Sequence, residues 1–278
     1  MQAAAAANKS VQPDWLAELD RELRFHPITN RAPKTLSLEQ VEAFNRDGCL
    51  APLDVFNASE IAVHRAYFDG LLERVRAEGK DSYSINGWHA KCPGIWDLVT
   101  EPRIVAIARD LLGEDVVCWG THYFCKLPRD GKAVSWHQDA EYWPFSQSRT
   151  VTVWLALDDA DPGNGCMQVL PGSHLHGELE HGRSGEDERN VLWLTAQGVE
   201  RFGAPRDVAL KAGQISIHSD LTLHSSPPNP SERRRCGLTL RYVPAEVVPY
   251  RGWGANAIRV SGEDRKGLWG NRPRPAEL

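Results

Sequence analysis

The sequence lacks long apolar runs, closely paired cysteines and a recognisable leader segment. No stretch approaches the roughly 20 apolar residues of a membrane-spanning helix. The alanine-rich start MQAAAAANKS has neither a basic leader nor an apolar segment of signal-peptide length. The six cysteines form no CxxC pair, and a chain of 278 residues is too large to need a disulfide framework. We therefore expect a cytoplasmic protein with no membrane partner.

The sequence also lacks a strong charge of either sign. The formal net charge is -5, with acidic and basic residues interspersed, which argues against nucleic acid or an anionic membrane as the main partner. The densest basic run holds only three arginines, at 233–235, and a solvated surface is its simplest interpretation. The length suits one large domain or two small ones. No internal repeat or apolar interface is recognisable, so the oligomeric state stays open.

Helix signals dominate before residue 113. A capping-box spacing at 37–40 precedes LEQVEAFNRDG, with Gly48 as the expected helix end. The same spacing recurs at 57–60, ahead of an apolar stripe at helical period. A third helix is expected over residues 102–113, because proline is favoured in a first helical turn.

After residue 113 the sequence changes to short strand patterns separated by turns such as DPGNG and LPGSH. Strands behind a helical prefix predict a mainly β fold, a β-sandwich or jelly roll with the helices packed outside one sheet. Alternation within RTVTVWLALDD predicts a Thr and Trp face toward a cavity and a Val and Leu face away from it. The polar segment 177–190 is the expected lid. The expected strands are DVVCWGTHYFCKL, KAVSWHQDA, RTVTVWLALDD, CMQVL, RDVAL, QISIH, LTLHS and CGLTLRYVP.

The stretch SWHQDAEYW, residues 135–143, places a histidine two residues before an aspartate. Side chains alternate along a strand, so His137 and Asp139 are expected to share a face and to converge on one ion. Two histidines and one carboxylate form the facial triad of non-heme Fe(II) oxygenases. An isolated HxD triplet is more often a surface feature than a ligand pair, so a metal site needs a third ligand.

A second cluster, HSDLTLHSSPPNPSERRRCGLTLRYVP, offers that ligand. His218 and His224 are both candidates by composition. Eleven residues after His224 stands Arg235, whose planar guanidinium can bind a carboxylate through two hydrogen bonds and stays charged when buried. A dicarboxylate co-substrate needs such a group, so we expect metal and anion sites on adjacent strands.

Three motifs occur in this order: WHQD, VWLALDDADPGNGCMQVLPGSH, and HSSPPNPS followed at a distance by R and RY. With these motifs the chain resembles the phytanoyl-CoA dioxygenase family of Fe(II)/2-oxoglutarate-dependent oxygenases. The resemblance covers about residues 36–245 and implies a double-stranded β-helix, a jelly roll with the metal between its sheets. The expected division is an N-terminal extension (1–35), a single oxygenase domain (36–260) with a helical part (36–113) and a jelly-roll core (114–245), and an irregular tail (261–278).

The resemblance implies a role for individual positions. His137, Asp139 and His224 match the iron ligands, and His224 is preferred to His218 because it has the downstream spacing to Ser226 and Arg235. Arg235 is implied to bind the remote carboxylate of 2-oxoglutarate, assisted by Ser226. The other implied contacts are Trp154 and Lys126 for the co-substrate and His122, Tyr142 and Trp143 for the substrate.

The implied activity is hydroxylation of a C–H bond with Fe(II), 2-oxoglutarate and O2, releasing succinate and CO2. Halogenating relatives lack the carboxylate that Asp139 provides, so hydroxylation is the default outcome, with desaturation, ring closure or epimerisation as alternatives. The expected substrate is a small polar molecule such as an amino acid, a phosphonate or a natural-product intermediate. A zinc hydrolase and a non-catalytic ligand-binding barrel are alternatives of another class. Arg235 argues against the hydrolase, because hydrolysis needs no dicarboxylate co-substrate.

Overall fold

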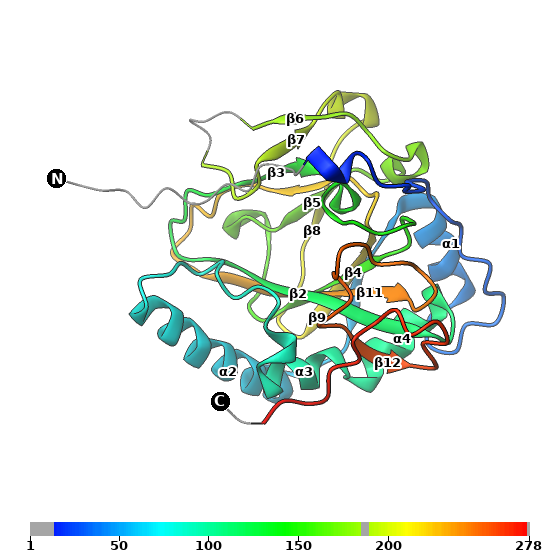
Figure 1. Cartoon of the computed structure of the whole chain (residues 1–278). Coiled ribbons are helices and arrows are strands. Elements are labelled where there is room, and N and C mark those ends of the chain that lie inside the picture. Colours follow the sequence, from blue (N-terminus) through cyan, green and yellow to red (C-terminus); the bar gives the residue numbers. More distant parts are fainter. Residues whose placement is uncertain (1–13, 185–188, 277–278) are drawn as a thin grey trace.

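A computed structural model describes residues 14–184 and 189–276 as two facing β-sheets with helices along the outside of one sheet (Figure 1). Within these ranges no helix is both long enough and apolar enough to cross a membrane. The α-helices are α1 (Leu38–Asp47), α2 (Ala58–Ala77), α3 (Pro93–Val99) and α4 (Pro102–Leu112). The short 3-10 turns are η1 (Asp14–Leu16), η2 (Trp88–Ala90), η3 (Asp139–Tyr142), η4 (Pro162–Asn164), η5 (Ser173–His176) and η6 (Val199–Phe202).

The first helices begin and end where the sequence predicts. The Ser37 hydroxyl accepts a hydrogen bond from the Gln40 backbone N–H, and the Gln40 side chain accepts one from the Ser37 N–H, so α1 opens with a complete capping box. It ends at Gly48, whose φ of 73° lies in the left-handed region that favours glycine. Helix α2 opens with a second capping box. The short helix α3 was not predicted, although Pro93 marks its first turn.

The strands of the described ranges form a six-stranded sheet, a four-stranded sheet and a separate two-stranded ribbon. The larger sheet has the order β1-β9-β4-β11-β2-β12, the smaller sheet β3-β10-β5-β8, and β6 pairs with β7. Figure 1 shows the smaller sheet above the larger one, and this pair of sheets confirms the predicted jelly roll. The strands are β1 (Cys49–Asp54), β2 (Val116–Lys126), β3 (Val134–His137), β4 (Val151–Ala156), β5 (Met167–Val169), β6 (His181–Arg183), β7 (Leu194–Ala196), β8 (Arg206–Val208), β9 (Gln214–Ser219), β10 (His224–Ser226), β11 (Arg235–Pro244) and β12 (Ile258–Ser261).

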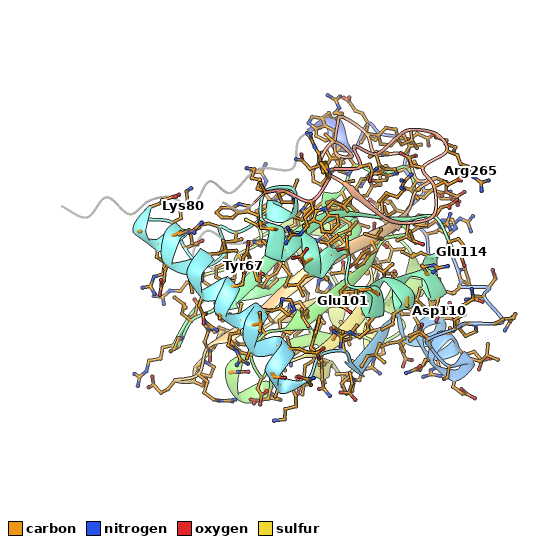
Figure 2. All side chains as sticks on the ribbon, turned by 90° about the horizontal axis from the view of Figure 1, so that it is seen from below. Tyr67, Lys80, Glu101, Asp110, Glu114 and Arg265 are labelled. Atoms are coloured by element: carbon orange, nitrogen blue, oxygen red, sulfur yellow. The ribbon has the colours of Figure 1, made fainter. Side chains whose placement is uncertain are left out.

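The two faces of the larger sheet have opposite chemistry. Val153 and Leu155 of β4 are fully buried in the main apolar core, which they share with the helices. Thr152 and Trp154, on the alternate positions, line a cavity between the sheets. The predicted alternation along this strand is therefore confirmed. In Figure 2, which views the molecule from below, the helices spread across the outer face of the sheet.

Apolar contacts attach the helices to the sheet. Phe68 of α2 is fully buried, and its ring centroid lies 4.6 Å from that of Tyr123 in β2. Burial of a side chain of this size contributes about 1.5–3 kcal/mol. The Tyr242 hydroxyl of β11 donates to the backbone carbonyl of Val99 at the end of α3. The helices thus support the sheet from outside, which leaves the inner face free for polar side chains.

Two predicted segments are described in part. Before α1, the backbone N–H groups of residues 34–36 donate to the carboxylate of Asp110 in α4, so this end of the predicted extension is attached to the domain. The predicted lid, 177–190, contains β6, and its residues 185–188 lie outside the described residues. The domain boundaries and the closing role of the lid remain predictions.

Candidate metal centre

His137 and His224 face each other on neighbouring strands. In the antiparallel pair of β3 and β10, His224 is the direct partner of His137. Strand β3 ends at His137, and Asp139 opens the turn η3, where the N–H of Ala140 donates to the backbone carbonyl of Asp220. Gln138 between them is still extended, with φ -106° and ψ 130°, so His137 and Asp139 converge as expected even though Asp139 opens a turn. One possible ligand atom from each of His137, Asp139 and His224 lies within 4.8 Å of the other two.

Hydrogen bonds fix the orientation of this triad. The Nδ1 atoms of His137 and His224 lie 2.8 and 2.9 Å from the backbone carbonyl oxygens two residues earlier. Each ring can donate from Nδ1 and turn the lone pair of Nε2 toward Asp139, whose Oδ1 lies 3.6 Å from Nε2 of His137 and 3.9 Å from that of His224. The Thr152 hydroxyl donates to the other carboxylate oxygen at 3.0 Å. These hydrogen bonds fix the orientation of all three side chains.

His218 lies beside the triad but lacks this orientation. Its Nε2 is 3.6 Å from Oδ2 of Asp139, and its ring centroid is 4.4 Å from that of His224. In the described part of the chain, neither of its ring nitrogens has a hydrogen-bond partner. A metal-bound histidine almost always donates its second nitrogen to a carbonyl or carboxylate group. This difference supports His224 as the third ligand and makes His218 a neighbour of the centre.

The protonation states of Asp139 and His224 suit a metal ion. Burial alone would raise the pKa of the Asp139 carboxyl, but His137, His218 and nearby positive charge hold that pKa well below its usual range. Burial, with His137 and His218 beside it, lowers the pKa of His224 well below the ordinary imidazole value. At neutral pH the carboxylate is therefore ionised and His224 is neutral, which are the forms that bind metal.

The donor set fits a ferrous ion. The three side chains are 5–8% exposed, and Thr152 occupies Oδ2, so Asp139 offers Oδ1 alone. Two imidazoles and one carboxylate oxygen on one side of an ion match the facial triad of non-heme iron oxygenases, which leaves positions for co-substrates. Zinc accepts the same donors. The rest of the cavity must therefore distinguish an oxygenase from a hydrolase.

Arg235 lines the same cavity as the triad. Its side chain is 2% exposed, its Nε and Nη2 donate to the Gly165 carbonyl at 2.9 and 2.6 Å, and its Cζ lies 5.4 Å from the ring centroid of Trp154. A Cβ at position 237 would overlap the Trp154 ring, so Gly237 makes room for the indole. Ser226 also lines the cavity, and Nη1 of Arg235 makes no hydrogen bond within residues 14–184 and 189–276. A fixed guanidinium with free N–H groups is suited to a carboxylate.

Comparison with known proteins also points to an iron-dependent oxygenase. The model of a family described as phytanoyl-CoA dioxygenase (PhyH) matches residues 44–237. This chain belongs to the phytanoyl-CoA dioxygenase family. Membership confirms the predicted resemblance and fold, and it confirms the predicted class of enzyme, the oxygenases that depend on non-heme iron and 2-oxoglutarate.

Relatives of the phytanoyl-CoA dioxygenase family resemble most of this chain. An ectoine dioxygenase of Nocardia farcinica (strain IFM 10152) is 32% identical over 246 residues, covering 80% of this chain and 82% of the relative. A probable alpha-ketoglutarate-dependent hypophosphite dioxygenase of Stutzerimonas stutzeri is 31% identical over 169 residues, covering 60% of this chain and 58% of that relative, which is less than two thirds of its length. The apo structure of the non-heme monooxygenase ThoJ is 30% identical with a TM-score of 0.73, covering 85% of this chain and 88% of that one.

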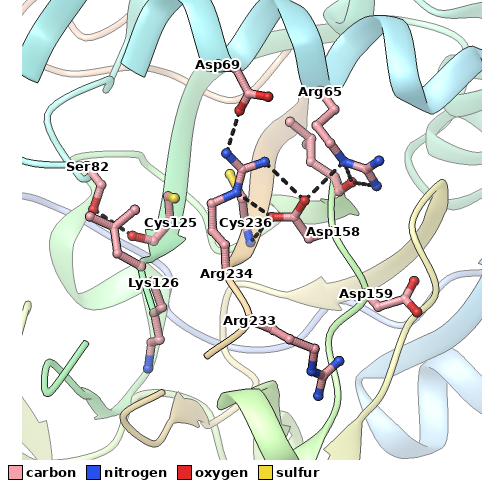
Figure 3. A network of polar contacts seen from close by, with 12 residues as sticks. Arg65, Asp69, Ser82, Cys125, Lys126, Asp158, Asp159, Arg233, Arg234 and Cys236 are labelled. Atoms are coloured by element: carbon pink, nitrogen blue, oxygen red, sulfur yellow. Dashed lines mark hydrogen bonds and ion pairs between the residues drawn. The ribbon is translucent and has the colours of Figure 1, made fainter. Parts of the chain in front are cut away.

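The three consecutive arginines at 233–235 have three different environments in this family member. Arg233 forms an ion pair with Asp161 at 2.9 Å near the surface. Arg234 binds two aspartates, one in α2 and one just after β4, and Figure 3 shows this network. Arg235, on the opposite face of the strand, turns into the cavity. The interpretation of the run as solvated surface is therefore wrong for Arg234 and Arg235, because tertiary contacts leave Arg234 half-buried and Arg235 buried.

Lys126 does not line the cavity, although it was expected to contact the co-substrate. Its Nζ donates to the backbone carbonyls of Ser226, at 3.1 Å, and Pro227. Burial, followed by the charge of Arg235, lowers the pKa of Lys126 to about 6. These contacts let Lys126 brace the strand that carries Ser226, and they give no support to a contact with 2-oxoglutarate.

The predicted substrate residues lie in different places. Nε2 of His122 is 2.7 Å from a backbone carbonyl, and its ring packs against Phe124. Phe124 lines the cavity, whereas His122 does not. The ring centroid of Tyr142 lies 6.0 Å from that of His137, and the buried Tyr142 hydroxyl has no hydrogen-bond partner among the described residues. Tyr142 does not line the cavity either, so substrate contacts by His122 and Tyr142 both stay predictions.

Trp143 packs beside Arg241, a cavity residue that the sequence patterns above did not single out. The Trp143 ring is buried, and its centroid lies 5.2 Å from Cζ of Arg241, whose side chain lines the cavity. Arg241 stands six residues after Arg235 on β11, so strand alternation alone places both on the inner face. That periodicity could have identified it from the sequence.

Proposed function

We propose that this chain hydroxylates a C–H bond of a small polar molecule with Fe(II), 2-oxoglutarate and O2, releasing succinate and CO2. The observation that carries this proposal is a single buried cavity lined by the His137, Asp139 and His224 triad and by the guanidinium of Arg235. A hydrolase would need the triad alone, whereas an oxygenase of this class also needs a group that holds the remote carboxylate of its co-substrate.

The proposed roles follow from the contacts of each side chain. His137, Asp139 and His224 would hold the ferrous ion, which when bound supplies the activation of O2 at the expense of 2-oxoglutarate. Arg235 would bind the remote carboxylate of 2-oxoglutarate through its free N–H groups, with the Ser226 hydroxyl beside it. Buried walls keep bulk water from the reacting atoms and fix the co-substrate in one orientation.

The substrate class and the compartment are also proposals. Relatives are named for hypophosphite, ectoine and L-proline, all of them small polar molecules. We therefore propose a substrate of similar size and polarity. The six cysteines are buried and form no disulfide, which supports the proposed cytoplasmic location.

The decisive experiment is a screen of small polar molecules for O2-dependent release of succinate, with each product analysed by mass spectrometry. A product that gains one oxygen atom supports hydroxylation, whereas loss of two hydrogens would indicate desaturation or ring closure instead. The same protein should give a weak visible charge-transfer band when Fe(II) and 2-oxoglutarate are added without oxygen. Absence of both the band and succinate would contradict the proposed function.

A further inference from the structure

Arg241 is a buried cation that faces the cavity, and no polar partner for it lies among the described residues. Its side chain is 9% exposed and lines the cavity together with the triad and Arg235. Within the ranges that the structure describes, its guanidinium forms no hydrogen bond or ion pair, and its Nε is buried without an acceptor. A buried charge without a partner is unfavourable. A bound ligand would supply the missing acceptors.

Two tryptophans hold the Arg241 guanidinium in place. Its Cζ lies 5.5 Å from the ring centroid of Trp119 and 5.2 Å from that of Trp143. Indole faces attract a cation, but they accept no strong hydrogen bond from its N–H groups. Arg234, by contrast, is satisfied by two carboxylates. The surroundings of Arg241 therefore orient the charge and leave its planar donor fork available.

The charge balance of the cavity also favours an anion. Two guanidinium groups, Arg235 and Arg241, and one carboxylate, Asp139, line its wall. A divalent iron and a doubly charged 2-oxoglutarate add equal and opposite charge, so one positive charge stays uncompensated. Lys126 adds little, because burial lowers its pKa to about 6. One further negative charge would neutralise the loaded cavity.

Strand register places Arg241 on the metal side of the cavity. Arg241 is the direct partner of Thr152 in the β11–β4 pair, and Thr152 is the partner of His218 in the β4–β9 pair. The Thr152 hydroxyl also holds Asp139. An anion on Arg241 would therefore lie close to the triad, whereas Arg235 stands six residues earlier, at the start of the same strand.

We propose that Arg241 binds the carboxylate, or another small oxyanion, of the substrate and so selects substrates with one negative charge. This inference rests on the proposed function, because it assigns Arg235 to 2-oxoglutarate. An anchor beside the triad would fix one end of the substrate and limit which C–H bond can approach the iron.

Acetate and acetamide provide a direct test, because they differ in charge and little in size. The protein is loaded with Fe(II) and saturating 2-oxoglutarate without oxygen, at constant ionic strength, and each compound is titrated while tryptophan fluorescence is recorded. Acetate should give a saturable change, since Trp119 and Trp143 flank the site, and acetamide should give none. Equal responses to both compounds, or no response to acetate, would overturn the anion site.

Variants separate a ligand site from a structural cation. Arg241→Gln should weaken acetate binding by about tenfold or more, and Arg241→Lys should retain part of it. The exposed Arg265, whose partner is Glu263, offers the control Arg265→Gln, which should bind acetate like the parent protein. An unchanged acetate affinity in Arg241→Gln would contradict the proposal. If that variant does not fold, the Arg241→Lys variant must still bind acetate more weakly than the parent protein.

The visible band in the same sample separates this inference from the proposed function. A sample that shows the Fe(II) and 2-oxoglutarate band but no acetate response rejects the anion site alone. A protein that gives no band and also releases no succinate rejects the oxygenase. The substrate screen adds a second readout. Any acid that raises succinate release should lose this effect when its carboxylate is replaced by a carboxamide, and an equally active amide would refute the selection of anions.

Discussion

The two faces of the larger sheet differ in the kind of side chain that they bury. On the outer face, Leu238 and Leu240 of β11 are fully buried against the helices. On the inner face of the same strand, Arg235 and Arg241 are also buried, but some of their N–H groups have no hydrogen-bond partner among the described residues. Burial thus has two meanings here. The outer face packs apolar side chains against the helices and contributes stability, whereas the inner face carries the polar side chains of the candidate site.

The largest expected effect is on the inner face, at the triad. Replacing Asp139 or His224 by alanine should lower succinate release more than about a hundredfold, because even groups around a metal ligand affect a site by about 10- to 100-fold. His218→Ala is the matched control, since His218 lies beside Asp139 without the fixed orientation of a ligand. It should lose less than His224→Ala. Equal losses in these two variants would show that the ligand assignment is wrong.

A substitution on the outer face should affect stability alone. Phe68→Ala removes a fully buried ring that packs on Tyr123 and should lower the free energy of unfolding by about 3–5 kcal/mol. Urea unfolding measures this loss. The iron affinity of the folded variant should equal that of the parent protein. A large change in that affinity would mean that the two faces are coupled rather than separate.

A substitution at Arg235, on the inner face, should lower the affinity for 2-oxoglutarate. Arg235→Gln should raise the 2-oxoglutarate concentration needed for half-maximal succinate release by about 10- to 100-fold, because a hydrogen bond to a charged group contributes about 1.5–3 kcal/mol. Arg233→Gln, on the neighbouring surface arginine, is the control and should leave that concentration unchanged. A normal requirement in Arg235→Gln would remove the argument against a hydrolase.

The smallest of these effects is expected at Thr152. Thr152→Val keeps the shape of the side chain but removes the hydrogen bond to Oδ2 of Asp139, so iron affinity should fall by about tenfold. Competition with a chelator measures this change. Thr239→Val removes a hydroxyl that also lines the cavity but donates to a backbone carbonyl. It should bind iron normally, and a similar loss in both variants would point to general loosening of the sheet.

Sequence patterns were sufficient where the backbone itself sets the geometry. Alternation along β4 correctly divided Thr152 and Trp154 from Val153 and Leu155, because adjacent side chains of a strand must point to opposite faces. Spacing also selected His224, which the structure places opposite His137. These features depend on local geometry and on one strand pairing, so they can be predicted from the sequence.

The sequence could not show which side chains the rest of the fold had already engaged. Lys126 and His122 were expected in the cavity, but backbone carbonyls of distant segments accept their hydrogen bonds. Strand β3 ends before Asp139, which opens a turn whose Ala140 N–H donates to the carbonyl of Asp220, after β9. The environment of Arg241 comes from two tryptophans on other segments. Such contacts are set by tertiary packing and leave no periodic signal.

The central claim is that one cavity holds iron and 2-oxoglutarate together. It is tested most directly by a crystal structure of the protein grown without oxygen in the presence of both, with anomalous scattering recorded at the iron absorption edge. The account predicts an iron peak bonded to His137, Asp139 and His224, with the remote carboxylate of 2-oxoglutarate on Arg235. Iron bound through His218 instead of His224, or 2-oxoglutarate bound away from Arg235, would contradict it.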